Sequence, residues 1–121
     1  MSEIAVQTVK VTTAGGDGAA VGSGTSMPVQ GFLLDVFIDY HGDAPATTDV
    51  TISQGTFGNI VVKSDNATDC WLAPRKQSCD AAAADSGQYD LIPVSGPLTI
   101  AVAQADALTD CVSVTFRWLT P

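Results

Sequence analysis

The sequence has few residues that carry out chemistry. Its 121 residues include one histidine, His41, and three cysteines, Cys70, Cys79 and Cys111. A catalytic triad needs a base, a nucleophile and an orienting acid together, and nothing in the sequence marks a nucleophile for His41. No Cys-x-x-Cys pair is present, which argues against a structural zinc site. We therefore expect a protein that is not an enzyme and that binds no metal and no cofactor.

Positive charge is scarce as well. Five Lys and Arg residues stand against thirteen Asp and Glu residues, so the formal net charge is -8 at pH 7. Such a surface repels phosphate backbones, because nucleic-acid binding rests largely on cationic neutralisation of phosphates. We expect no direct contact with DNA or RNA. The acidic surface instead suits a protein that stays dispersed until it docks on a partner.

Long apolar runs are missing too. No stretch of 18 apolar residues occurs, and the start, MSEIAVQTVK, has no basic segment followed by an apolar one. The sequence therefore predicts neither contact with a membrane nor export by a classical signal. With an odd number of cysteines, it favours free thiols in a reducing compartment. A bridge between Cys70 and Cys79 stays open as an alternative.

What the sequence has in plenty is two-residue alternation of apolar and polar side chains. The clearest example is residues 31–43, GFLLDVFIDYHGD, whose odd positions include Leu33, Asp35, Phe37 and Asp39. The even positions from 32 to 40 are all apolar: Phe32, Leu34, Val36, Ile38 and Tyr40. Alternate side chains of a strand point to opposite faces, so we expect the even positions in the core and the odd positions on an outward face.

The same period recurs in about eight segments separated by turn residues. These segments are residues 3–12, 19–25, 27–40, 48–54, 59–64, 88–94, 96–104 and 110–119. Without a convincing helix, they predict a single all-β domain over residues 1–121. The strand count favours a jelly-roll-like two-sheet β-sandwich, with an immunoglobulin-like sandwich as the alternative. Between them, Asp80 and the alanines that follow are weakly typical of one capped helical turn.

The two aspartates of the central segment raise the question of a catalytic carboxylate pair. Asp35 and Asp39 are four residues apart on one strand, which places them about 13 Å apart by the strand rise. Carboxylates that cleave glycosides lie about 5 to 10 Å apart. The spacing therefore favours two solvated or rim carboxylates on the outward face.

Residues 71–77, WLAPRKQ, concentrate Trp71, Arg75 and Lys76 in the longest irregular connection. Aromatic residues and Arg are enriched in the cores of interfaces, and loops on a rigid scaffold often carry binding. Either Trp71 is tucked under its own loop, or the segment contacts an acidic protein partner. Together with Leu33 and Phe37, the apolar members of the outward face, these three residues are the candidates for partner contact.

With these segments in place, the chain resembles the small structural proteins of tailed bacteriophages. The resemblance rests on the Val- and Thr-rich start, on PVQGFLLDVFIDYHGDAPATTDVTIS, on WLAPRKQ and on GPLTIAVAQADALTDCVSVTFRW. It implies a capsid cement or decoration protein that binds the outside of a phage head and stabilises capsomer junctions. The implied partners are the major capsid protein and further copies of the chain, as a dimer or trimer. The implied location is the virion surface, after assembly in the host cytoplasm.

Two other functions stay open. A place at the neck or tail of the particle fits the same resemblance. A carbohydrate-binding, lectin-like module would share the sandwich and would use surface Trp, Tyr and Asp residues. An enzyme is the weakest interpretation, because histidine and clustered acids are both in short supply.

Overall fold

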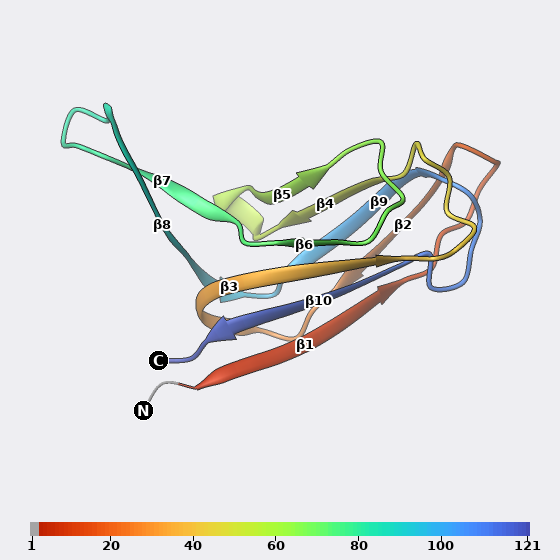
Figure 1. Ribbon diagram of the computed structural model, residues 1–121. Coiled ribbons are helices and arrows are strands. Elements are labelled where there is room, and N and C mark those ends of the chain that lie inside the picture. The colour runs from red at the N-terminus through yellow and green to blue at the C-terminus, as the bar shows by residue number, and fades with distance from the viewer. Residues whose placement is uncertain (1–2) are drawn as a thin grey trace.

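The computed structural model describes residues 3–121 and folds them into two antiparallel sheets packed face to face (Figure 1). Within these residues there are ten strands and one short 3-10 helix, η1 (Gly55–Phe57). The strands are β1 (Ile4–Val11), β2 (Ala20–Thr25), β3 (Val29–Tyr40), β4 (Asp49–Ser53), β5 (Asn59–Lys63), β6 (Cys70–Leu72), β7 (Arg75–Cys79), β8 (Asp85–Gly96), β9 (Thr99–Ala105) and β10 (Val112–Leu119). The all-β two-sheet sandwich is therefore confirmed, with two more strands than expected. No helix of the described residues is long and apolar enough to span a membrane.

The strand order is that of a jelly roll. One sheet runs β1-β10-β3-β8-β7, with β6 also paired to β3, and the other runs β2-β9-β4-β5. The first and last strands pair, the second pairs with the second-to-last, and the chain crosses between the sheets as it folds inward, as in two joined Greek keys. An immunoglobulin domain pairs its first two strands in one sheet. Here β1 and β2 lie in different sheets, so the jelly-roll prediction is confirmed over its alternative.

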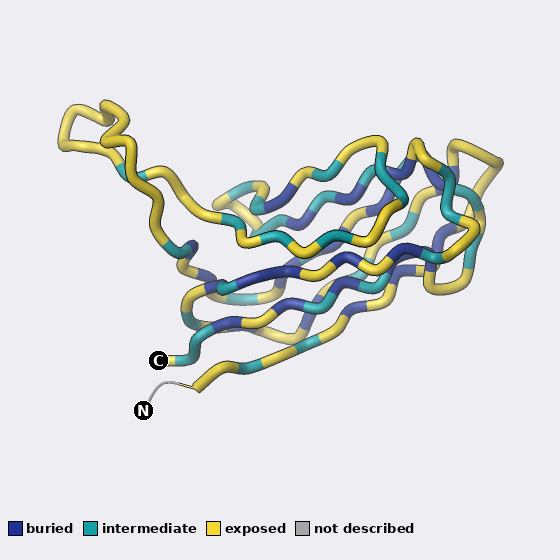
Figure 2. The backbone as a smooth tube through the Cα atoms, in the orientation of Figure 1, coloured by how far each residue is buried: buried dark blue, intermediate teal, exposed yellow. Residues whose placement is uncertain are grey.

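The position next to β3 is shared by two short ladders. β6 pairs with β3 at residues 36–38, and the last part of β8 pairs with it at residues 29–33. Between these ladders, β7 and the first part of β8 leave the sandwich as a hairpin, which we call the arm (residues 75–90; Figure 1). Every residue of the arm except Ser78 is exposed (Figure 2). The arm therefore contributes nothing to the core.

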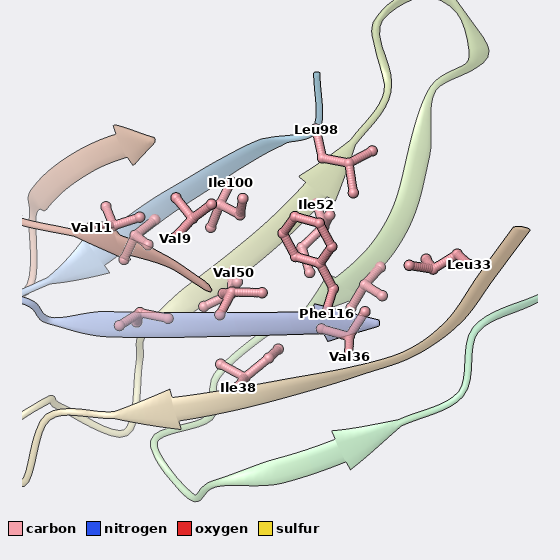
Figure 3. Close-up of a cluster of buried hydrophobic side chains, with 14 of the residues drawn as sticks. Val9, Val11, Leu33, Val36, Ile38, Val50, Ile52, Leu98, Ile100 and Phe116 are labelled. Atoms are coloured by element: carbon pink, nitrogen blue, oxygen red, sulfur yellow. The ribbon is translucent and has the colours of Figure 1, made fainter. Parts of the chain in front are cut away.

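The core lies between the two sheets, and alternation along the later strands fills it. Its largest fully buried side chains include Phe116, Leu33, Ile38, Ile52, Leu98 and Ile100 (Figure 3). The apolar positions predicted for the last two segments are buried: Leu98, Ile100, Val102, Val112, Val114, Phe116 and Trp118. These predictions are confirmed, because the period of an undistorted strand assigns faces directly.

The prediction for the first half of the central segment is wrong. Leu33, expected on the outward face as a partner-contact residue, is fully buried. Phe32, expected in the core, is 47% exposed. From Val36 onward the alternation is as predicted, and Phe37 lies outward. A change of face must therefore occur within β3.

A β-bulge in β3 causes this change of face. Asp35 pairs with Arg117 of β10, but the next residue of β10, Trp118, pairs with Leu33. Leu34 is left as an extra residue opposite no partner. One extra residue sends all side chains on one side of it to the other face of the sheet. Apolar residues on both faces of the segment hid the bulge from the sequence.

The connection between β5 and β8 is more regular than expected. Residues 70–79 form β6 and β7, and no helical turn follows. Instead, the side-chain Oδ1 of Asp80 accepts hydrogen bonds from the backbone N–H groups of Ala82 and Ala84, both at 2.9 Å, and closes the turn of the arm. Cys70 and Cys79 form no bridge, and the three cysteines of the chain are free thiols.

Candidate functional site

The outward side of the six-stranded sheet is organised as rows of side chains. Directly opposed residues of neighbouring strands point to the same face. The strand registers set three such rows: Ile4, Leu119 and Phe32; Val6, Arg117 and Asp35; and Thr8, Thr115, Phe37 and Trp71. The hydroxyls of Thr8 and Thr115 hydrogen-bond across their pair at 2.8 Å, as residues on one face should. We call this surface the outer face.

The outer face carries an unusual share of exposed apolar side chains. Ten large apolar side chains are exposed among the described residues, and five of them lie here. They are Ile4, Val6, Phe32, Phe37 and Trp71. Scattered apolar residues are normal on a protein surface, but several on one face mark an interaction site.

Asp35 lies in the middle row, and both oxygens of its carboxylate accept hydrogen bonds. Arg117 donates from Nε to Oδ1 at 2.7 Å and from a terminal nitrogen to Oδ2, which makes a bidentate salt bridge. The indole N–H of Trp71 donates to Oδ2 at 3.0 Å. The bond from Arg117 holds the pKa of Asp35 below its ordinary value, burial opposes this shift, and the bond from Trp71 adds to it. The pair therefore stays charged at neutral pH.

This arrangement corrects the prediction of two solvated or rim carboxylates. Asp39 is exposed as expected, but Asp35 is only 8% exposed because Trp71 and Arg117 cover it. Sequence reasoning did not identify Arg117 as a member of the site. Asp35 and Arg117 are 82 positions apart, and no local pattern indicates a pair formed by register.

Trp71 lies exposed on the sheet, where its indole N–H reaches Asp35, instead of packing beneath its loop. It is 71% exposed and pairs with Phe37 across β6 and β3. The alternative in which the ring is tucked under its own connection is therefore wrong. With Asp35, Thr115 and Arg117, the two aromatic residues line a shallow hollow of about 210 Å³.

Arg75 and Lys76, the other two residues predicted from the WLAPRKQ segment, line a second hollow. One side of this hollow is formed by η1 and the start of β5, and the other side by the base of the arm. Its volume is about 460 Å³. Arg75 donates from one terminal nitrogen to the backbone carbonyls of Leu34 and Pro74, at 3.0 and 2.9 Å. The structure therefore divides the five predicted contact residues: two lie on the outer face, two in this hollow, and Leu33 in the core.

Metal ligands do not gather in the part of the chain that the structure describes. No three or more His, Cys, Asp or Glu side chains of residues 3–121 are close enough to hold an ion. The side chains on the outer face can instead offer apolar contact, aromatic stacking and one pre-formed ion pair. Contacts of these kinds can bind another molecule to the outer face.

Comparison with known proteins adds little to this site. Neither a protein-family model nor a curated protein sequence matches the chain. Among solved structures, it is similar to the crystal structure of FLHE, at 12% identity and a TM-score of 0.39, over 97% of this chain and 93% of that one. It is similar to a family two carbohydrate esterase from Cellvibrio japonicus, at 15% identity and a TM-score of 0.39, over 98% of this chain but 33% of that one.

A virus particle is also among the similar structures. It is the extra small virus VLP of the giant freshwater prawn Macrobrachium rosenbergii, at 11% identity and a TM-score of 0.37, over 98% of this chain and 78% of that one. Similarity of this degree does not assign a function to the chain.

Proposed function

We propose that the protein is a non-enzymatic virion structural protein, a cement or decoration protein that docks on the outside of a phage head through its outer face. The observation that carries the proposal is the gathering of five exposed apolar side chains on one rigid sheet. A monomer is not stabilised by leaving these groups in water, whereas an exposed apolar face suits docking on another protein. The sequence resemblance supplies the partner, the major capsid protein.

The polar centre of the outer face suits such docking. Aromatic residues and Arg are the side chains enriched in interface cores, and Trp71, Phe37 and Arg117 supply both kinds. Covering an unpaired charge would be costly, but Arg117 is already paired with Asp35. Docking therefore buries apolar surface without leaving a lone charge beneath it.

Stabilisation of the head follows from binding itself. A protein that binds the assembled capsid, and not its separated subunits, shifts the equilibrium towards assembly by mass action. The net charge of -8 disfavours non-specific aggregation of the protein in the host cytoplasm before it binds the head. The expected location is the surface of the virion.

A matched pair of variants tests the proposal. Val6 lies on the outer face and Val62 on the outward side of the other sheet, and their exposures are 59% and 60%. Both lie on strands, so Val6→Asp and Val62→Asp add the same charge at equally exposed sites. Binding to phage particles stripped of the protein is measured by co-sedimentation. We expect Val6→Asp to abolish binding and Val62→Asp to bind as the wild type does.

Three results would count against the proposal. Purified virions could lack the protein, the two variants could bind equally well, or particles without the protein could survive heat and low ionic strength as well as intact ones. A particle map showing the density at the neck or tail would keep a structural role but move it from the head.

A carbohydrate-binding function is the second candidate, and the hollow beside Trp71 favours it. An exposed aromatic ring with neighbouring polar groups is the usual composition of a small-ligand site, and Asp35 and Arg117 border the ring. Both oxygens of Asp35 are already occupied, however, which leaves few acceptors for sugar hydroxyls. Calorimetric titration with a glycan panel tests this function, with Trp71→Ala as control. Absence of heat across the panel would reject it.

A further inference from the structure

The arm is ordered without a core of its own. Its two strands are joined by a ladder of pairs from Arg75 with Leu91 to Cys79 with Asp85. The hydroxyls of Ser78 and Ser86 hydrogen-bond across it at 2.7 Å. A two-stranded ribbon standing alone in water is marginally stable at best. An arm of this kind gains stability when it lies against another surface.

The tip of the arm is acidic and otherwise apolar. It consists of Asp80, the exposed residues Ala81–Ala84, and Asp85, with no cation from residue 77 to residue 90. Asp85 uses Oδ1 to accept the backbone N–H of Gly87 at 2.7 Å, and Asp80 also uses only Oδ1. Each carboxylate therefore keeps one oxygen with no hydrogen-bond partner among the described residues. We call Asp80–Asp85 the arm tip.

The hollow at the base of the arm has the opposite character, and we call it the groove. Its apolar lining consists of Phe57, Ile60, Ile92, Pro93 and Val94. Arg75 and Lys76 also line it, and they are two of the five cations of the chain. Within residues 3–121, the one salt bridge joins Arg117 and Asp35, so neither groove cation is in a salt bridge, although Asp90 lies opposite Lys76 across the arm.

The arm tip and the groove complement each other but cannot meet within one chain. The strand pairing holds the arm extended, so the four steps from Arg75 to Cys79 carry the tip about 14 Å from its base. We propose that the arm tip of one copy docks in the groove of a second copy. Alanine methyl groups lie on the apolar lining, and the carboxylates of Asp80 and Asp85 pair with the cations of the groove.

This contact closes on itself when copies are related by symmetry. In a two-fold pair each copy donates one tip and receives one. The proposal does not depend on binding to a capsid, because neither the arm tip nor the groove belongs to the outer face. It predicts self-association of the purified chain, weakened by salt because charge pairs near a surface are screened.

Charge reversal provides the test. Sedimentation velocity of the full chain across a range of concentrations gives the mass and the dissociation constant. We expect the wild type to form a closed oligomer, and we expect Lys76→Glu and Asp85→Lys each to weaken association at least about tenfold, since each places like charges together. Lys10→Glu makes the same charge change on an exposed residue of β1, outside the groove, and should associate as the wild type does.

Mixing the two reversed variants makes the test independent of folding defects. The tip of the Asp85→Lys variant then meets the groove of the Lys76→Glu variant with opposite charges, and the unchanged tip and groove also meet. We expect the mixture to regain wild-type association. Three outcomes would overturn the proposal: a wild type that stays monomeric at every concentration, association that neither reversal weakens, or association that mixing does not restore.

Discussion

At Gly31 the bulged part of β3 lies close to the end of β10. The φ of Gly31 is +139°, and a Cβ placed there would lie 1.9 Å from the carbonyl oxygen of Leu119. Real Cβ contacts essentially never fall below 3.0 Å, so Gly31→Ala must push the two strands apart by about 1 Å in a close-packed region. Since this part of β3 sets the faces of Phe32 and Leu33, the variant tests the geometry beneath the outer face.

The expected cost has two parts. Holding a non-glycine residue in an unfavourable backbone conformation costs about 1 to 3 kcal/mol. The forced displacement of packed neighbours costs about 1 to 3 kcal/mol, as overpacking does. We expect Gly31→Ala to lower the free energy of unfolding by about 3 kcal/mol, a large part of the about 5 to 15 kcal/mol typical of a domain. At about 4 °C per kcal/mol, the melting temperature falls by about 12 °C.

Urea and thermal unfolding, followed by circular dichroism, measure this loss. Gly42→Ala is the matched control, because a Cβ at Gly42 meets nothing within 4 Å and its φ is ordinary. That substitution should leave stability unchanged or raise it by about 0.4 to 1 kcal/mol through the unfolded chain. If Gly31→Ala unfolds at the same midpoint as Gly42→Ala, the close approach of β3 to β10 is refuted.

Three further predictions concern the ion pair, the core and the thiols. Because Asp35 has a folded pKa below its ordinary value of 3.8, it contributes stability above that pH, and the contribution is lost as pH falls through the lower folded pKa. The urea midpoint of Asp35→Asn should therefore fall less between about pH 5 and about pH 2 than the midpoint of the wild type does; an identical acid profile would contradict this prediction. Phe116→Ala should lower the free energy of unfolding by about 3 to 5 kcal/mol in the same assay, whereas Thr115→Ala, on the outer face, should cost about 1 kcal/mol or less. A thiol reagent followed by peptide mapping should label exposed Cys79 well before Cys111, which is fully buried and has a pKa raised by burial; equal rates would show that the core opens.

Much of the architecture was predictable because it depends on the local two-residue alternation of apolar and polar side chains. Alternation in residues 96–104 and 110–119 places Leu98 and Phe116 in the core without knowledge of their partners. The same reasoning fails at Leu33, where a single extra residue reverses the faces. It also fails at residues 70–79, whose polar and irregular sequence hides two strands. Pairing with β3 and β8, and not local propensity, makes these residues extended.

The candidate site was predictable only in part. Trp71 and Phe37 were identified from the sequence because exposed aromatic residues are typical of interfaces. Their meeting with Arg117 and Asp35 was not, because three strands distant in sequence bring these side chains together. The arm and its groove were likewise invisible, since a hairpin that leaves the sandwich has the same local pattern as one that stays within it.

The sequence by itself determined that this chain is a two-sheet sandwich, with an acidic surface and few groups for catalysis. Those properties depend on composition and on the two-residue period, which each segment carries alone. Only the tertiary structure decided the register of β3 against β10, and with it which side chains form the outer face. Register depends on hydrogen bonds and contacts between strands far apart in the chain, and one bulge reverses what the local period predicts.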